Sequence, residues 1–186
     1  MWAFGLASLL TDLSSEAIHA LLPVFLVTTL GASPLALGLI EGVAEAIASA
    51  MKPLTGYFSD RWRNRKVPVV IGYSVSALVK PLFALAASPL WVFAARTCDR
   101  FGKGIRGAPR DALISEITPA AVRGAAYGLR QALDTVGAIL GPLVAIAALG
   151  LWGLDARAVF WMATVPAILA VVVLIVLVKE PRRARA

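Results

Sequence analysis

Long apolar segments are the feature of this sequence that most restricts its fold. Six of them follow one another, over residues 2–30, 34–59, 67–87, 89–112, 120–150 and 156–178. A helix needs about 20 residues to cross the hydrocarbon core of a bilayer. Short connections rich in glycine, proline or charge separate the segments. We therefore predict an all-helical membrane protein, with six transmembrane helices in one domain that covers residues 1–186.

The composition supports a location in the membrane and excludes other classes. Only 16% of the residues are charged, against about 25% in soluble domains. The net charge of +7 comes from basic residues between apolar segments rather than on a polar domain, so we expect no nucleic-acid partner. The first apolar residues follow no Lys or Arg and are interrupted by Asp12 and Glu16, which predicts a retained helix rather than a signal peptide.

The distribution of basic residues predicts the orientation. Alternate connections and the C-terminal tail are basic, whereas the opposite connections carry only Arg157, beside Asp155. Basic loops stay in the cytoplasm, so both termini are expected there. Six spans, an even number, return the chain to the side on which it began, which agrees with this orientation. The basic residues concerned are Arg61, Arg63, Arg65, Lys66, Arg123, Lys179, Arg182, Arg183 and Arg185.

Ionisable side chains also occur inside the apolar segments. At membrane depth such residues face the bundle interior or a water-filled cavity, and here their spacing places them on common helix faces. Several helices would thus line a hydrophilic path. The alternative is structural ion pairing across the bundle, with Asp12 or Glu16 meeting Arg130 or Lys80. The set consists of Asp12, Glu16, His19, Glu41, Glu45, Lys80, Arg130 and Asp134.

The carboxylates of this set are candidate proton sites. A buried carboxylate takes up or releases a proton when a cation leaves or approaches, and the candidates are Asp12, Glu16, Glu41 and Glu45. His19 titrates in the right range, although a hydrogen-bonded packing role is the alternative. One histidine and one cysteine are a weak basis for a metal site. We expect no metal and no cofactor, with H⁺ as the coupling ion.

The stretch from Arg96 to Asp111 is the most charged part of an otherwise apolar region. It contains Gly102-Lys-Gly-Ile-Arg-Gly107, which fits the glycine pattern of a nucleotide-binding loop. That pattern requires a preceding strand and a βαβ unit, and here it follows an apolar span. We therefore predict the charged half of a helix and no enzyme. Asp99 is expected to pair with Lys103, four residues on, and Arg96 to point into the path.

Two further motifs, with this stretch, resemble the major facilitator superfamily of transporters. Gly56, Asp60, Arg61 and Arg65 match its loop signature G-x-x-x-D-R-x-G-R-R/K. This sequence departs from the signature at Arg63, where the family usually has Gly, and at Asn64, where it has a basic residue. Its antiporter signature in the fifth helix is similar to the spacing of Gly128, Gly137, Gly141 and Pro142. The segment from Arg96 to Gly102 resembles R-x-x-Q-G-x-G, with Asp99 and Arg100 in place of Gln and Gly.

The resemblance implies the N-terminal six-helix half of a larger fold. It implies a secondary transporter of a bacterial inner membrane that exports a small organic solute with proton coupling, by alternating access. Arg96 would serve the coupling, and the fifth-helix glycines and Pro142 would form a moving packing interface. The cytoplasmic gate would comprise Gly56, Asp60, Arg61, Arg65, Asp99, Arg100, Arg106 and Arg110.

A lone half would expose its polar stripes to lipid. We therefore expect a parallel homodimer or a second six-helix half as partner, beside the bilayer and a small-molecule substrate. The alternative is a six-helix membrane module that folds and dimerises without transporting anything.

Overall fold

The computed structural model describes residues 2–61 and 65–178, without the side chains of residues 52 and 58–61. All regular structure within them is helical, which confirms the predicted class. The elements are α1 (Trp2–Val24), the π-helical turn η1 (Phe25–Thr29), α2 (Pro34–Arg61), α3 (Lys66–Ala84), α4 (Pro89–Ile117), the 3₁₀ turn η2 (Ala120–Val122), α5 (Arg123–Gly150) and α6 (Ala156–Leu177).

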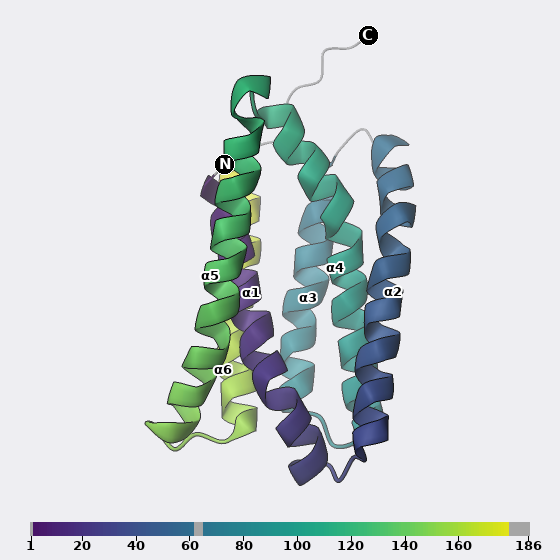
Figure 1. Ribbon diagram of the computed structural model, residues 1–186, viewed down its shortest axis with the longest axis vertical. Coiled ribbons are helices and arrows are strands. Elements are labelled where there is room, and N and C mark those ends of the chain that lie inside the picture. The colour runs from purple at the N-terminus through teal and green to yellow at the C-terminus, as the bar shows by residue number, and fades with distance from the viewer. Residues whose placement is uncertain (1, 62–64, 179–186) are drawn as a thin grey trace.

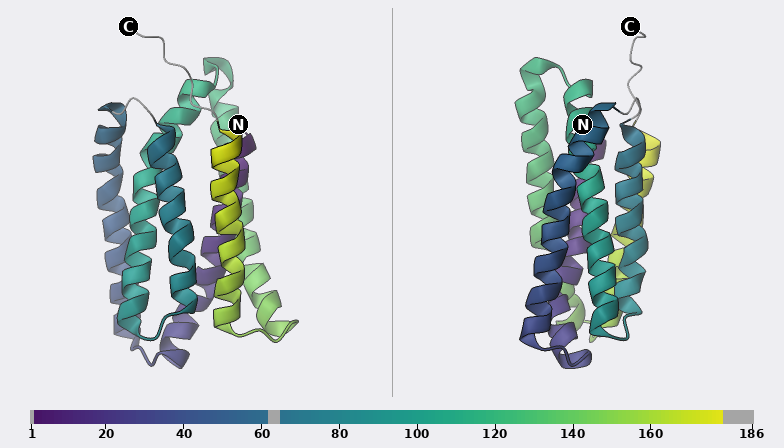
Figure 2. Two further views of the ribbon diagram at one scale, coloured as in Figure 1. Left: turned by 180° about the vertical axis from the view of Figure 1, so that it is seen from behind. Right: turned by 90° about the vertical axis from the view of Figure 1, so that its right-hand side faces the viewer.

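The helices run alternately up and down in one bundle (Figure 1). α1 packs against α5 and α6, α4 packs against α2 and α3, and α3 also packs against α6. Seen from behind, α3 and α6 lie in front (Figure 2). α4 and α5 touch little, so the front of the bundle opens between α1 and α5 on one side and α2 and α4 on the other. We call the end where α1 begins and α6 ends the terminal end.

The helix boundaries follow local chemistry. α4 starts at Pro89, whose missing N–H is no loss in a first turn, after Ser88 caps the helix by accepting from the Trp91 N–H at 3.3 Å. Its C-terminal end lies five residues beyond the predicted position, at Ile117. The extended backbone of Thr118 ends it there, because a residue before proline avoids helical geometry. α3 ends at Ala84, three residues before the predicted position.

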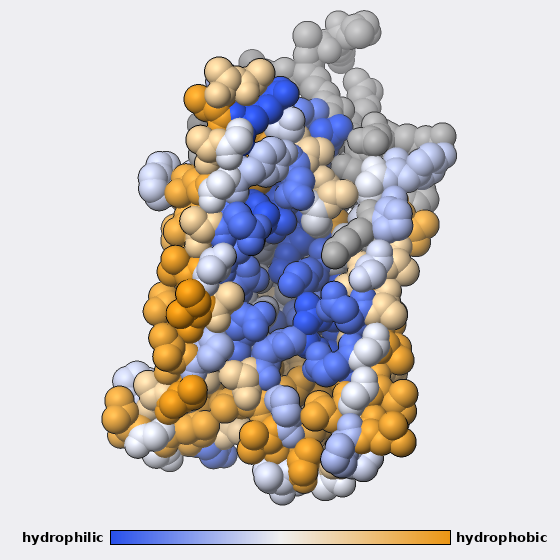
Figure 3. Space-filling view, in the orientation of Figure 1, coloured by the Kyte–Doolittle hydropathy of each residue, from blue (hydrophilic) through white to orange (hydrophobic). Residues whose placement is uncertain are grey.

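Five of the described helices are long and apolar enough to cross a membrane: α1 with η1, α2, α3, α5 with η2, and α6. α4 has the length but carries the charged stretch, and several of its charged side chains are buried within the bundle. In Figure 3 hydrophilic side chains fill the middle of the front, between hydrophobic edges on α5 and α2. A lipid-facing surface would not be polar, so this front, the polar face, is suited to water or a partner.

Two of the predicted helix-5 residues bring α5 against α1. A Cβ on Gly137 would lie 2.5 Å from the Leu9 carbonyl oxygen, and one on Gly141 would lie 2.8 Å from the Ala17 nitrogen. The close approach expected for this motif is therefore made to a helix of the same chain. Gly128 has nothing within 4 Å of such a Cβ, so it takes no part in this packing. Pro142 lies within α5.

Candidate functional site

A cluster of charged side chains lies within the half of the bundle away from the terminal end, and we call it the charged cluster. Arg96 is its centre, with a side chain only 1% exposed. Its Nη2 and Nε both donate to one oxygen of Glu41, at 2.7 and 3.2 Å. Arg100 pairs with Glu45 at 3.5 Å. The members are His19 from α1, Glu41 and Glu45 from α2, Lys80 from α3, and Arg96, Asp99 and Arg100 from α4.

A fully buried ion pair closes the back of the charged cluster. The Lys80 ammonium lies 3.0 Å from the Asp99 carboxylate and donates to Ser15 at the same distance. Such a pair is stable only when both partners are present. The prediction that Asp99 pairs with Lys103 was wrong, because Asp99 faces α3, where Lys80 supplies a buried cation. Lys103 instead lines a cavity.

His19 lies between two guanidinium groups. Its Nδ1 is 3.0 Å from Arg96 Nη2, and its Nε2 is 3.0 Å from Arg100 Nη2. A guanidinium only donates, and a neutral imidazole has a lone pair on only one of its nitrogens. His19 can therefore accept from Arg96 or from Arg100, but not from both at once. The tautomer of the ring therefore decides which of the two arginines donates to it.

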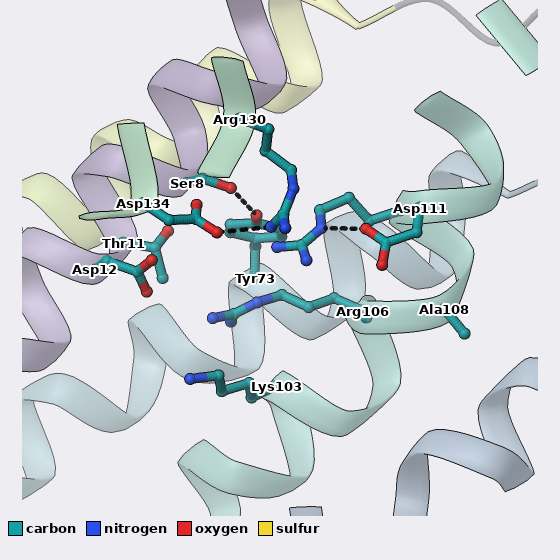
Figure 4. A pocket seen from close by; sticks show the side chains of 12 residues that line it. Ser8, Thr11, Asp12, Tyr73, Lys103, Arg106, Ala108, Asp111, Arg130 and Asp134 are labelled. Carbon is teal, nitrogen blue, oxygen red and sulfur yellow. Dashed lines mark hydrogen bonds and ion pairs between the residues drawn. The ribbon is translucent and has the colours of Figure 1, made fainter. Parts of the chain in front are cut away.

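A polar cavity of about 410 Å³ occupies the other half of the polar face, toward the terminal end. Figure 4 shows its side chains converging from α1, α3, α4 and α5. Arg130 pairs with Asp134 at 2.7 Å within α5, and Arg110 pairs with Asp111 at 3.2 Å within α4. The lining comprises Ser8, Thr11, Asp12, Tyr73, Lys103, Arg106, Gly107, Ala108, Arg110, Asp111, Arg130 and Asp134.

The alternative of structural ion pairing across the bundle is met by other partners, Lys80 with Asp99 and Arg96 with Glu41, and not by Asp12 or Glu16. Arg130 takes its partner from its own helix and Lys80 takes Asp99, so neither binds Asp12 or Glu16. Asp12 lies in the cavity. Glu16 lies where α1 meets α5, with its Cβ beside Gly141, and it is in none of the ion pairs of the described residues.

The described residues assigned to a gate lie at several separate places in the bundle. Asp99 and Arg100 lie in the charged cluster, and Arg106 and Arg110 line the cavity. Arg65 pairs with Glu116 at 3.1 Å and so links the start of α3 to the end of α4. Gly56 faces Ala108 of α4, a built Cβ lying 3.7 Å away. The side chains of Asp60 and Arg61 lie outside the described residues.

Several side chains of this region were missed from the sequence as site residues, among them Tyr73 and Lys103 of the cavity lining and Ser76, which contacts Arg106. Tyr73 is buried and stacks under the Arg106 guanidinium, 4.3 Å from its ring centre. Its position seven residues before Lys80 could have placed it on the same helix face. Ser76, buried nearby, accepts from Arg106 Nη1 at 2.7 Å.

Comparison with known proteins agrees with this architecture. The sequence-family model of the Major Facilitator Superfamily matches residues 4–186 of this chain. An uncharacterized MFS-type transporter of Methanocaldococcus jannaschii is 42% identical over 146 residues, which is 78% of this chain and 36% of that protein. Multidrug resistance protein MdtH of Yersinia pestis is 28% identical over 74% of this chain and 34% of that protein. The chain spans about a third of the length of these curated relatives.

Solved structures show the same fold. A bacterial homologue of the human lysosomal transporter Spinster, in an inward-facing and unoccupied conformation, superposes with a TM-score of 0.82 at 23% identity, over 99% of this chain and 43% of that one. A peptide transporter in complex with sulfate superposes with a TM-score of 0.83 at 17% identity, over 94% and 36%. The chain is a membrane protein that belongs to the major facilitator superfamily of transporters.

Proposed function

We propose that this chain forms a six-helix half of a secondary active transporter, and that its polar face lines the path of a small organic solute. The support is the pattern of Figure 3, a polar centre between apolar edges. Ionised side chains facing lipid would cost a few kcal/mol each. A second six-helix half, either another copy of this chain or a separate one, covers the polar face and completes the path.

The terminal end is the cytoplasmic end in this proposal, by the positive-inside rule. The cavity then lies toward the cytoplasm, and the charged cluster lies toward the opposite side. Alternating access would open each in turn. Export is supported by the Yersinia relative, whose name is that of a multidrug resistance protein.

The observation that supports proton coupling is the unequal exposure of the Arg96 and Glu41 side chains. The Arg96 side chain is 1% exposed and that of Glu41 is 37% exposed, so a proton from the path reaches the carboxylate while the guanidinium stays enclosed. A proton on Glu41 removes the nearest compensating charge from a buried cation, which is strongly unfavourable. Arg96 would then be left with Asp99 as its remaining carboxylate, 4.0 Å from its Nη1.

Proteoliposomes with an enclosed pH dye test this coupling. A panel of small organic solutes is added under an imposed pH gradient, and solute-dependent proton movement is recorded. Glu41→Gln should abolish that movement while leaving solute exchange without a gradient. Glu45→Gln is the matched control. Glu45 lies one helical turn from Glu41 and pairs with Arg100, and its side chain is more exposed, at 58%. This variant should keep the coupling. Equal coupling in Glu41→Gln and the unchanged protein would contradict the proposal.

A further inference from the structure

The charges of the cavity are not balanced by its own side chains. Four cationic and three anionic residues line it. Arg130 is paired with Asp134 and Arg110 with Asp111, which leaves Lys103 and Arg106 against Asp12. Within the described part of the chain, none of these three forms an ion pair. One positive charge is therefore in excess.

Arg106 is held in place without being neutralised. It is 5% exposed, its Nη1 donates to Ser76 at 2.7 Å, and its guanidinium lies over the Tyr73 ring. Both contacts fix its orientation, but neither supplies a negative charge. An arginine does not lose its proton, and a buried charge without a counter-ion is costly. An anion in the cavity would supply the direct ion pair that Arg106 lacks within the described residues.

Lys103 extends the same cationic surface toward the opening of the cavity. It lies one helical turn before Arg106 and is exposed, so the two side chains share one side of α4. Figure 4 shows both extending from α4 in the same direction, toward the side of the cavity where Asp12 lies. The hydroxyl groups of Ser8 and Thr11 line the α1 wall. A bound anion between them would meet the buried guanidinium of Arg106 at depth and the exposed ammonium of Lys103 nearer the surface.

We propose that this cavity binds a small organic monocarboxylate, with its carboxylate on Arg106 and Lys103. The inference rests on the proposed function, since it names the class of solute that the path would take. A planar carboxylate fits the donor fork of a guanidinium, and its single charge equals the excess. The volume of about 410 Å³ falls in the usual range for small-molecule sites.

Asp12 determines which solute charge the cavity prefers and how strongly it prefers it. Its carboxylate holds the excess at one positive charge, so a cationic solute is disfavoured and a second negative charge on the solute has no partner. Removing the charge of Asp12 should therefore strengthen anion binding. The same change would weaken the binding of a cation, and so Asp12→Asn distinguishes an anion site from a cation site.

Calorimetry on the purified full chain in detergent, with any half it assembles with, tests the site. The probes are acetate, hexanoate and benzoate, each against its amide, with benzylamine as a cation. We expect one of the carboxylates to bind at least about tenfold more tightly than its amide, because the charge-assisted contacts are lost in the amide. Lys103→Gln, which changes an exposed residue, and Arg106→Gln should weaken that binding by about tenfold or more. Asp12→Asn should strengthen it.

Equal binding of every acid and its amide, tighter binding of benzylamine, or weaker carboxylate binding in Asp12→Asn would overturn the inference. Unfolding of Arg106→Gln would leave Lys103→Gln and Asp12→Asn as sufficient tests, since neither residue is held in an ion pair. Binding requires no transport, so the two proposals fail separately. Solute-driven proton movement without carboxylate binding contradicts this inference alone, and carboxylate binding without transport contradicts the proposed function alone.

Discussion

Arg96 directs two donors at a single oxygen of Glu41, at 2.7 and 3.2 Å, from a site where its own side chain is 1% exposed. The two residues are 55 positions apart, so the pair fastens α4 to α2 at the charged cluster. Because only the Arg96 side of the pair is buried, losing Glu41 leaves an enclosed cation without its nearest counter-ion.

Replacing Glu41 alone should destabilise the protein more than the same replacement does in a protein that also lacks the Arg96 guanidinium. Glu41→Met leaves the guanidinium without its nearest counter-ion and should cost about 2–3 kcal/mol. Arg96→Met should cost less, because Glu41 is 37% exposed and remains hydrated. The double variant should recover part of the loss of Glu41→Met, as read from unfolding in detergent. Strictly additive effects would show that the two side chains do not interact.

The position of His19 between two guanidinium groups predicts its tautomer in variants. His19 is the only histidine of the chain, so its ring nitrogens can be followed by ¹⁵N NMR without overlap. Arg100→Gln should leave Nδ1 as the acceptor for Arg96 and place the proton on Nε2. Arg96→Gln should favour the other tautomer, since Nε2 then accepts from Arg100. A doubly protonated ring at neutral pH in the unchanged protein would contradict the geometry, because an imidazolium has no lone pair to accept with.

The glycines of α5 predict opposite effects of the same substitution. Gly137→Ala would place a Cβ 2.5 Å from the Leu9 carbonyl oxygen of α1, and pushing two packed helices apart costs about 1–3 kcal/mol. Gly128→Ala meets nothing within 4 Å and should be neutral or stabilising by about 0.5–1 kcal/mol, through helix propensity. The melting temperatures of the two variants measure this. A neutral Gly137→Ala would mean that α1 and α5 are farther apart than described.

The sequence was sufficient for the helices but not for their pairings. Apolar length predicted where the helices lie to within a few residues, although the last five residues of α4, up to the boundary set by Pro119, were missed. Which charges meet depends on how each helix is rotated and how deep it sits relative to its neighbours, and the period of one helix contains neither quantity. Asp99 therefore looked like a partner for Lys103 on its own helix, whereas α3 brings Lys80 within 3.0 Å.

The division into a charged cluster and a cavity was equally inaccessible from one sequence. The polar stripe from Arg96 to Asp111 is continuous along α4. It is the partners from α1, α2, α3 and α5 that divide it into two sites. Tyr73 and Ser76 were missed because a tyrosine and a serine in an apolar segment usually indicate packing, and their role appears only beside the guanidinium of Arg106.

The most direct test of the proposed path is the access of water to the polar face. The chain has one cysteine, Cys98, so a Cys98→Ser background is free of thiols. In that background Lys103→Cys places a thiol in the cavity at the middle of α4, and Leu78→Cys places one on the outer surface of α3, where Leu78 is 75% exposed. Both are labelled in membranes with a charged, membrane-impermeant maleimide applied to both sides.

A water-filled path predicts that Lys103→Cys reacts at least about tenfold faster than Leu78→Cys, because only a hydrated thiol ionises to the reactive thiolate. The rate for Leu78→Cys should stay near background, since lipid covers that surface. Equal, slow labelling of both positions would contradict the central claim, for it would mean that the polar face is closed to water and lines no path.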